Sequence, residues 1–202
     1  HHAGTFGDVA AFSFYPGKNL GAAGEAGGII TNNKSLYEKI RIMRDVGQSK
    51  KYIHSMYGVN SRMATIQAAV LGVKLKRLAE WNSKRREAAS EYRRLLFDLP
   101  IVLPPDLGPD YVFNYHVFPI RVKKRDHLLA YLKAQGVNCG IHYPIPVHVQ
   151  KALKELKYKN GDFPITEKYA KELLSLPIFP ELTKPEIKYI SDLLHTYFKN
   201  GK

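Results

Sequence analysis

Residues 10–21, Ala-Ala-Phe-Ser-Phe-Tyr-Pro-Gly-Lys-Asn-Leu-Gly, form the stretch from which the fold of this chain can be inferred. Residues 9–14 are small, apolar and aromatic apart from Ser13, a composition typical of a β-strand. The pair Pro16-Gly17 then ends the strand, because proline lacks a backbone donor and glycine adopts backbone angles that other residues avoid. Lys18 is therefore expected in a loop just beyond a strand end, where α/β proteins commonly place their chemistry.

Lys18 could equally be an ordinary loop lysine, since the chain contains 31 lysine and arginine residues. Two features favour a binding role: Ser13 lies five residues upstream, and glycines follow at positions 21, 24, 27 and 28. Small residues and free backbone N–H groups suit a phosphate-bearing cofactor. Neither the P-loop pattern nor the dinucleotide-binding glycine pattern can be written on this stretch.

The segment Ser13–Gly21, followed by Gly24-Glu25-Ala26-Gly27-Gly28, resembles the signature of the StrS/DegT/DnrJ-type nucleotide-sugar aminotransferases. The resemblance implies that Lys18 carries pyridoxal phosphate (PLP) as a Schiff base and that Ser13 binds the cofactor phosphate. The family usually has Gly-Asp/Glu-Gly-Gly in the second half. Ala26 is therefore an inserted residue here, and it leaves the assignment of the lysine unchanged.

Further motifs extend the resemblance over essentially all 202 residues. The run Gly58-Val59-Asn60-Ser61-Arg62-Met63 resembles the family's G-x-N-x-R-M motif, and Ile141-His142-Tyr143-Pro144 resembles a motif of its small domain. Residues 48–52 are most similar to members that act on 3-keto sugars. The implied fold is α/β, a fold-type I PLP-dependent aminotransferase, comprising the end of the large mixed-sheet domain and a C-terminal small α/β domain.

The resemblance also implies an activity: transfer of an amino group, from L-glutamate, to a keto-sugar attached to a nucleoside diphosphate. Such reactions serve the synthesis of deoxyamino sugars for surface polysaccharides or antibiotics. Asn60 is implied to donate to the cofactor phosphate of a neighbouring subunit, which predicts a homodimer with shared active sites. On the residues alone, Asn60 could instead be a helix N-cap.

The start of the chain suggests a fragment. It begins at His1 without a methionine, His1 and His2 could be the end of a purification tag, and family members are close to twice this length. In the family, the aspartate that pairs with the pyridine nitrogen and the aromatic residue stacked on the cofactor ring precede the lysine. No residue of this chain can be assigned to either role, so we expect the chain alone to be inactive.

Composition limits the remaining classes. The single Cys139 excludes an internal disulfide, and no leader or run of 18 apolar residues predicts secretion or a membrane span, so a cytoplasmic protein is expected. The net charge of +13 could indicate nucleic-acid binding. The basic residues, however, are spread along the chain and form no recognised nucleic-acid-binding motif. A positive charge would equally attract a substrate that carries a diphosphate. A non-catalytic or regulatory relative is a further alternative, which the presence of Lys18 argues against.

Four residues are implied near the sugar nucleotide: Tyr52 and His54 in a polar basic loop, and His142 and Tyr143 in the small domain. Each has an ordinary alternative as a structural residue. His142, Tyr143 and His148 could also be metal ligands, but a pair of histidines without a third partner is a poor zinc signal, and no metal site is predicted.

The patterns of apolar residues, caps and breakers predict the regular elements. Prolines at 100, 104 and 105 place a domain boundary there, between residues 1–99 of the large cofactor-binding domain and residues 100–202 of the small domain. The predicted strands are residues 9–14, 27–31, 115–122 and 137–143, with an extended stretch at 176–180. The predicted helices are residues 35–44 (capped by Asn33 or Ser35), 61–80 (capped by Asn60 or Ser61), 82–97, 126–135, 150–156, 165–174 and a last helix capped by Thr183 that runs to 198.

Overall fold

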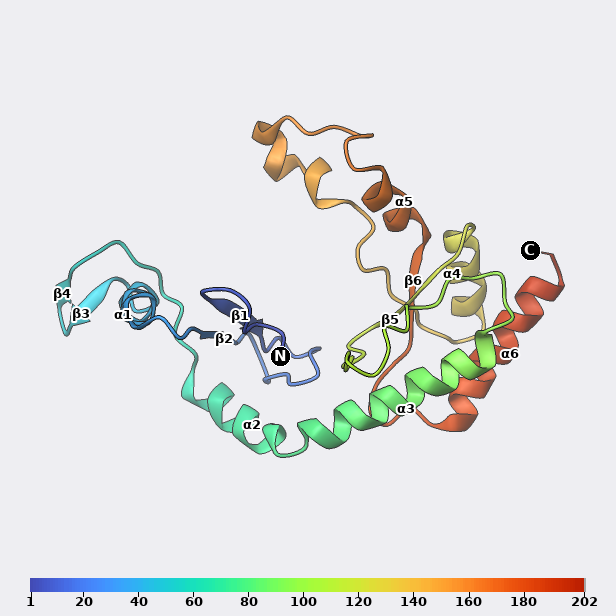
Figure 1. Ribbon diagram of the computed structural model, residues 1–202, viewed down its shortest axis with the longest axis horizontal. Helices are drawn as coiled ribbons and strands as arrows, with labels where there is room; N and C mark the ends of the chain where they lie inside the picture. The colour runs from blue at the N-terminus through green and yellow to red at the C-terminus, as the bar shows by residue number, and fades with distance from the viewer. Residues whose placement is uncertain (202) are drawn as a thin grey trace. The chain divides into compact units, whose positions relative to one another are not determined.

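The computed structural model describes residues 1–201, which form two compact units that divide between residues 79 and 80 (Figure 1). The N-terminal unit contains two antiparallel strand pairs and two helices. Its elements are β1 (Ala10–Ser13), β2 (Gly27–Ile30), α1 (Lys34–Met43), β3 (Gln48–Lys50), β4 (Ile53–His54) and α2 (Thr65–Leu75).

The strands β1 and β2 are the predicted pair on either side of the Lys18 loop. They run antiparallel, with Ala10 opposite Ile30 and Ser13 opposite Gly27. The helix α1 follows, capped by Asn33, whose Oδ1 accepts hydrogen bonds from the backbone N–H groups of Ser35 and Leu36 at 2.9 and 3.1 Å. Both strands and this cap are confirmed.

The polar stretch 48–54 is a short hairpin, so its prediction as a loop was wrong. Gln48 pairs with His54, and Lys50 pairs with Ile53. Tyr52 forms the turn with a φ of 67°, and its backbone N–H donates to Gln48 Oε1 at 2.9 Å. A side chain at the strand start thus stabilises a left-handed turn, a contact that the hydrophobic pattern does not reveal.

The predicted helix over residues 61–80 is two helices (Figure 1). The first, α2, begins at Thr65 after the extended residue Ala64, so neither Asn60 nor Ser61 is its N-cap. It ends at Leu75, and α3 (Leu78–Leu96) begins after a two-residue break. Periodicity does not locate this break, because no glycine or proline marks it.

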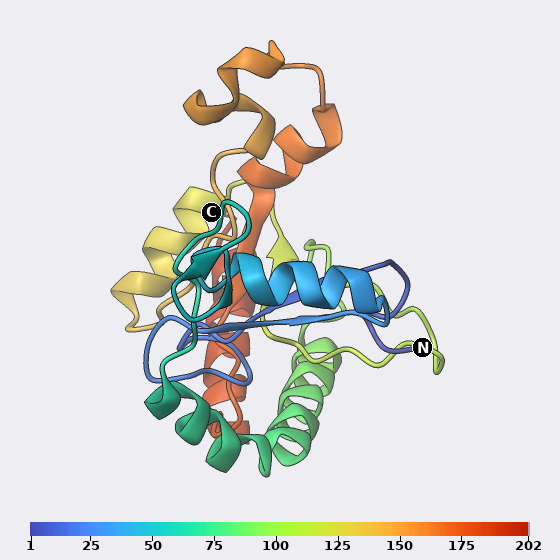
Figure 2. The same cartoon turned by 90° about the vertical axis from the view of Figure 1, so that its left-hand side faces the viewer.

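The C-terminal unit is built on the antiparallel pair β5 (Phe118–Arg121) and β6 (Leu173–Leu176). The helices α3, α4 (Arg125–Ala134) and α6 (Lys184–Lys199) contribute to one core, and α3 and α6 lie side by side in Figures 1 and 2. The shorter segments are the 3₁₀ turns η1 (Val147–Val149) and η2 (Lys151–Leu156) and the helix α5 (Pro164–Glu172). The fully buried large side chains of this core include Tyr92, Leu96, Phe118, Ile120, Leu128, Leu132, Leu174 and Leu194.

Three predicted elements in this unit were wrong in type or extent. Residues 137–143 form only an isolated bridge, between Gly140 and Ser175. The segment predicted as a helix over 165–174 ends at Glu172, because Leu173 and Leu174 pair with Arg121 and Ile120 of β5. The predicted helix at 150–156 is the 3₁₀ turn η2.

The division between units lies two residues inside α3 rather than at the proline-rich linker. Ala88, Ala89, Tyr92 and Leu96 of α3 pack in the core with the β5–β6 pair, so most of this helix belongs to the C-terminal unit. The domain boundary at residue 100 stays a prediction for the protein. No helix in residues 1–201 is long and apolar enough to span a bilayer.

Candidate functional site

Lys18 lies in a tight turn directly after β1. Its backbone N–H donates to the carbonyl oxygen of Tyr15 at 2.8 Å, which closes the turn over Pro16-Gly17. Phe14 frames the loop on both sides: its N–H donates to Ala26 O at 2.9 Å, and its carbonyl accepts from the N–H of Ala22 at 2.8 Å. The strand pair therefore holds Lys18 in a closed loop, as predicted from Pro16-Gly17.

Gly21 is where this loop doubles back on itself. A Cβ at this position would collide with the backbone carbonyl of Pro16. Because backbone atoms cannot move aside as a flexible side chain can, the loop requires glycine here. Gly27 is a milder case, since its Cβ would lie 3.0 Å from the carbonyl oxygen of Phe12 across the strand pair.

Two side chains of α2 form hydrogen bonds with the loop at Gly21 and Ala23. Gln67 Oε1 accepts a hydrogen bond from the N–H of Ala23 at 2.8 Å, and Lys74 Nζ donates to the carbonyl of Gly21. These two side chains position the Lys18 loop, and the sequence reasoning assigned them no role. The available signal was Gln67 itself, a polar residue within the otherwise apolar helix segment 66–70.

Ser13 and Lys18 offer two groups that could bind a phosphate-bearing carbonyl compound: a hydroxyl that can donate to the phosphate and an amine that can react with the carbonyl. Ser13 Oγ accepts a hydrogen bond from the N–H of Tyr15 at 3.3 Å, so its own O–H remains available to donate. Lys18 is half-buried, and within residues 1–201 no carboxylate lies within 4.0 Å of its ammonium group. An amine that forms no ion pair can act as a nucleophile once it is deprotonated.

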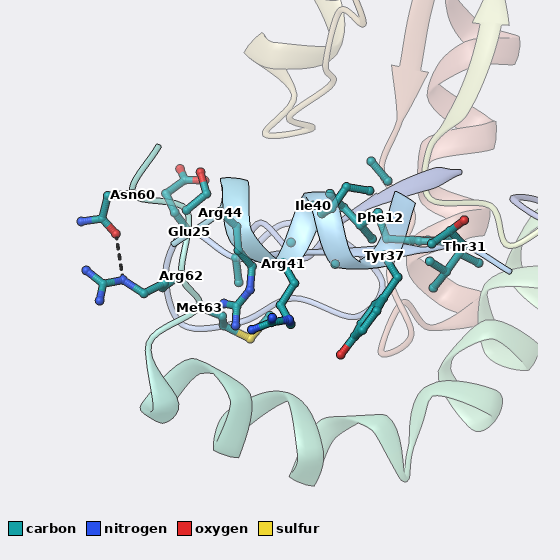
Figure 3. Close-up of a pocket in the computed structure, with 17 residues that line it drawn as sticks. Phe12, Glu25, Thr31, Tyr37, Ile40, Arg41, Arg44, Asn60, Arg62 and Met63 are labelled. Atoms are coloured by element: carbon teal, nitrogen blue, oxygen red, sulfur yellow. Dashed lines mark hydrogen bonds between the residues drawn. The ribbon is translucent and has the colours of Figure 1, made fainter. Parts of the chain in front are cut away.

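Asn60 lies in a different part of the same unit, in an open cleft of about 970 Å³ between the β1–β2 pair, α1 and residues 60–63 (Figure 3). Its Oδ1 accepts a hydrogen bond from Arg62 Nε at 3.3 Å, drawn as the dashed line in Figure 3. This bond leaves the two amide N–H groups of Asn60 for another acceptor. Ser13 and Lys18 do not line the cleft.

The cleft is basic. Arg41 of α1 and Arg44, which follows this helix, extend toward Met63, and Arg62 lies beside Asn60 (Figure 3). Arg41 pairs with Glu38 at 3.1 Å and Arg62 with Asp45 at 3.4 Å, both at the surface. Glu25 also lines the cleft, so the arginines supply guanidinium donors for an anionic ligand rather than a large net positive charge. Nothing in the sequence pattern singles out these arginines, although Arg62 belongs to the motif of Asn60.

Tyr52 and His54 lie on the β3–β4 hairpin. Tyr52 is 80% exposed, and Lys51 Nζ lies 5.1 Å from the centroid of its ring. His54 Nδ1 lies 3.0 Å from the carbonyl oxygen of Val46, which must accept this bond. The proton therefore sits on Nδ1, and Nε2 of the neutral ring is an acceptor.

His142 and Tyr143 belong to the C-terminal unit. Both are exposed, and His142 Nδ1 lies 3.0 Å from Ser175 Oγ. His148 does not join them: its Nε2 pairs with Glu167 Oε1 at 3.1 Å, and its ring packs on Phe163. His148 is therefore a structural residue. In the part of the chain that the structure describes, no three histidine, cysteine, aspartate or glutamate side chains converge as a metal site.

Comparison with known proteins gives a consistent result. The sequence profile of the DegT/DnrJ/EryC1/StrS aminotransferase family matches residues 1–195. The chain is 43% identical over 190 residues to the erythromycin biosynthesis sensory transduction protein EryC1 of Saccharopolyspora erythraea, covering 94% of this chain and 52% of that protein. It is 40% identical over 194 residues to a dTDP-3-amino-3,4,6-trideoxy-alpha-D-glucose transaminase of Streptomyces venezuelae, covering 96% of this chain and 51% of that protein.

A solved structure, that of NtdA from Bacillus subtilis with bound cofactor PMP, superimposes with a TM-score of 0.88 at 33% identity. The match covers 98% of this chain and 47% of that one. The chain thus spans about half the length of the relatives that it matches.

Proposed function

Because the chain belongs to the DegT/DnrJ/EryC1/StrS aminotransferase family, we propose that its protein transfers an amino group to the keto-sugar of a nucleoside-diphosphate sugar, with PLP as cofactor. The observation that carries the proposal is the Lys18 turn, in which a lysine with no ion pair to residues 1–201 follows a strand end and a serine hydroxyl. The predicted fold, that of a fold-type I PLP-dependent aminotransferase, is confirmed by the superposition with NtdA.

The residues present fit the cofactor. Ser13 Oγ and the Asn60 amide are donors for a phosphate, and Lys18 offers an amine for the carbonyl carbon of the cofactor. PLP, when bound, supplies the electron sink for breaking a bond at the amino-bearing carbon. Lys18 Nζ holds the cofactor and, when released from it, takes up and returns the proton of the reacting substrate carbon.

The substrate residues are proposed from the family motifs and the local geometry. Tyr52 offers an exposed aromatic ring and His54 an acceptor Nε2, while His142 and Tyr143 contribute from the C-terminal unit. The three arginines of the cleft offer hydrogen-bond donors for an anionic group such as a diphosphate. L-Glutamate is the proposed amino donor, and a 3-keto sugar is the proposed acceptor, as the name of the Streptomyces venezuelae relative suggests for that enzyme. The product would be a deoxyamino sugar for a surface polysaccharide or an antibiotic.

The lysine is tested by trapping the cofactor. The longest natural form of the protein that contains this chain is mixed with PLP, reduced with borohydride and mapped by peptide mass spectrometry. We expect one cofactor fixed on Lys18, and in Lys18→Arg we expect loss of both this adduct and amino transfer from glutamate to a dTDP-linked 3-keto hexose. Lys34→Arg, an exposed lysine at the start of α1, is the matched control. An adduct absent from Lys18 would contradict the proposal and favour a regulatory relative.

The proposed dimer is tested by complementation. If Asn60 serves the site of the other subunit, co-expressed Lys18→Ala and Asn60→Ala chains form hybrid dimers in which one site has both residues intact. Random pairing then restores about a quarter of the sites, although each variant alone is inactive. If Asn60 acts within its own subunit, no hybrid site is intact and activity stays absent. A monomer that binds the cofactor would also contradict the shared site.

A further inference from the structure

The C-terminal unit contains a small pocket of about 220 Å³ that the proposed roles of Lys18 and Asn60 do not involve. Its lining is largely polar and brings together residues from the turn after α4, the end of β6 and the approach to β5. The polar members are His116, Asn138, His142 and Ser175.

His142 is held in this pocket by Ser175. The Ser175 Oγ lies 3.0 Å from His142 Nδ1. Ser175 is 5% exposed, and its position is set by the strand β6 and by a backbone bridge to Gly140, with N–O distances of 2.8 and 3.0 Å. The contact therefore joins an exposed ring to a rigid, buried strand, so the ring does not rotate freely.

Gly140 leaves the space that the His142 ring occupies. A Cβ at Gly140 would lie 2.7 Å from His142 Cε1 and 3.3 Å from Nδ1. The imidazole thus folds back over the glycine toward β6. Any side chain at residue 140 would push the ring away from Ser175. The Gly140–Ser175 bridge, the absence of a side chain at Gly140 and the hydrogen bond therefore all hold the ring in the same position.

The direction of this hydrogen bond follows from the energetic cost of burying a hydroxyl that donates to no acceptor. A buried O–H group is costly without an acceptor, and in residues 1–201 the acceptor found for Ser175 Oγ is His142 Nδ1. Ser175 therefore donates, and Nδ1 of the neutral ring accepts. The ring proton must then be on Nε2, which is a donor toward a ligand.

We propose that Ser175 is a positioning residue that holds His142 as an Nε2–H donor to an oxygen atom of the sugar-nucleotide substrate, an inference that rests on the proposed function. A positive charge close to the pocket favours an electron-rich oxygen of the substrate there. Arg85, 7% exposed on α3, donates to the carbonyl oxygens of His116 and Ile178, which line the pocket, at 3.4 and 2.8 Å. The Arg85 guanidinium, whose charge Glu181 partly offsets, adds positive charge behind the pocket wall, which favours a polar oxygen in the pocket.

The position of the ring proton is measured first, by ¹⁵N NMR of the histidine rings of the complete protein in mildly alkaline buffer, where imidazole is neutral. We expect the Nε2–H tautomer for His142, and a mixture of tautomers in Ser175→Ala. Ser191→Ala is the matched control, because Ser191 is also a buried serine of this unit and donates to Ile187 O instead. An Nδ1–H tautomer in the parent protein, or no change in Ser175→Ala, would overturn the positioning role.

Kinetics then test the link to the substrate. In Ser175→Ala we expect the KM for the dTDP-linked 3-keto hexose to rise about tenfold, as for loss of one well-oriented hydrogen bond, while the KM for glutamate stays unchanged. Ser175→Thr keeps the hydroxyl and should restore the KM. Gly140→Ala should reproduce the defect with Ser175 intact. An altered tautomer with a normal KM would refute the substrate role of His142. A protein without any amino transfer but with the Nε2–H tautomer would refute the proposed function and leave the Ser175–His142 contact standing.

Discussion

At the scale of single residues, Glu167 connects two segments of the C-terminal unit through hydrogen bonds. It accepts hydrogen bonds from the backbone N–H groups of Gly161 at 2.8 Å and Phe163 at 3.3 Å, and it pairs with His148. The hydrogen bond from Gly161, with those from Phe163 and His148, lowers the pKa of Glu167 from its usual value. One side chain therefore ties the loop before α5 to the 3₁₀ turn η1.

This pKa shift predicts how stability depends on pH. Because the folded state binds the Glu167 proton less tightly than the unfolded state, the stabilisation is present above the ordinary glutamate pKa of about 4.3 and is lost as the pH falls through the lower folded value. Glu167→Gln should therefore lower stability at neutral pH, and the difference from the parent protein should shrink below about pH 4. Urea unfolding at several pH values measures this, and Glu155→Gln in η2 is the control. A difference that is independent of pH would contradict the assignment.

At the scale of elements, the start of α6 is set by its cap. Thr183 and Glu186 form a reciprocal capping box at the start of α6: Glu186 Oε2 accepts from the Thr183 N–H at 2.8 Å, and Thr183 Oγ1 accepts from the Glu186 N–H at 3.4 Å. The buried face of α6 carries Ile187, Ile190 and Leu194 into the core. Fraying of the first turn would therefore disturb the core as well as the helix end.

The cap gives a stability prediction. Thr183→Ala should destabilise the protein by about 1 kcal/mol, because it leaves an N-terminal N–H of α6 without its side-chain acceptor. Thr183→Ser should recover most of this loss. Thr196→Ala in the same helix removes a hydroxyl that bonds to the carbonyl of Asp192, and it should cost little, since alanine favours the helix interior. Equal losses from Thr183→Ala and Thr196→Ala in thermal or urea unfolding would argue against a capping effect.

The helix α2 should affect cofactor binding without contacting the cofactor. Gln67→Ala removes the acceptor for the Ala23 N–H and loosens the loop that holds Lys18. We expect PLP affinity to fall about tenfold in a spectroscopic titration, and Gln67→Glu, which keeps an acceptor oxygen, to restore most of it. Ile66→Ala, at an exposed neighbouring position, is the control. Unchanged affinity in Gln67→Ala would show that the loop holds its form without α2.

At the scale of the whole molecule, the two units differ in how much apolar surface they bury. In the described part of residues 1–79, the buried hydrophobic residues are Ala22 and Leu71, whereas Phe12, Ile29 and Ile30 are 40–53% exposed. The C-terminal unit has a continuous core that includes Tyr92, Phe118 and Leu194. Burial of apolar area provides most of the driving force for folding, so the units should differ in local stability.

Hydrogen exchange measured by mass spectrometry tests this difference. In the 202-residue chain, amides of α1 and the β1–β2 pair should exchange faster than those of α4 and α6, because local opening of the N-terminal unit exposes little additional apolar surface. In a longer natural form of the protein, additional chain that covers Phe12 and Ile29 should raise protection in residues 1–79. Equal protection of both units in the 202-residue chain would contradict this account.

Local chemistry made much of the fold predictable from the sequence. Pro16-Gly17 ends a strand through backbone geometry alone, and Asn33 and Thr183 cap helices through their own side chains. The family motif around Lys18 also depends on neighbours in sequence, which is why the turn, its lysine and its serine could be identified together.

Several features that the sequence left open depend on residues far apart in the chain. Leu173 and Leu174 join a strand rather than α5, because pairing with β5 outweighs their helical preference. The anchoring of Ala23 by Gln67 spans 44 residues, and the contact of His142 with Ser175 spans 33. The sequence by itself determined the turn at Pro16-Gly17, the caps Asn33 and Thr183, and the lysine that we propose for the cofactor. Only the tertiary structure decided which side chains position that lysine and His142, because such contacts form when packing brings distant segments within hydrogen-bond distance.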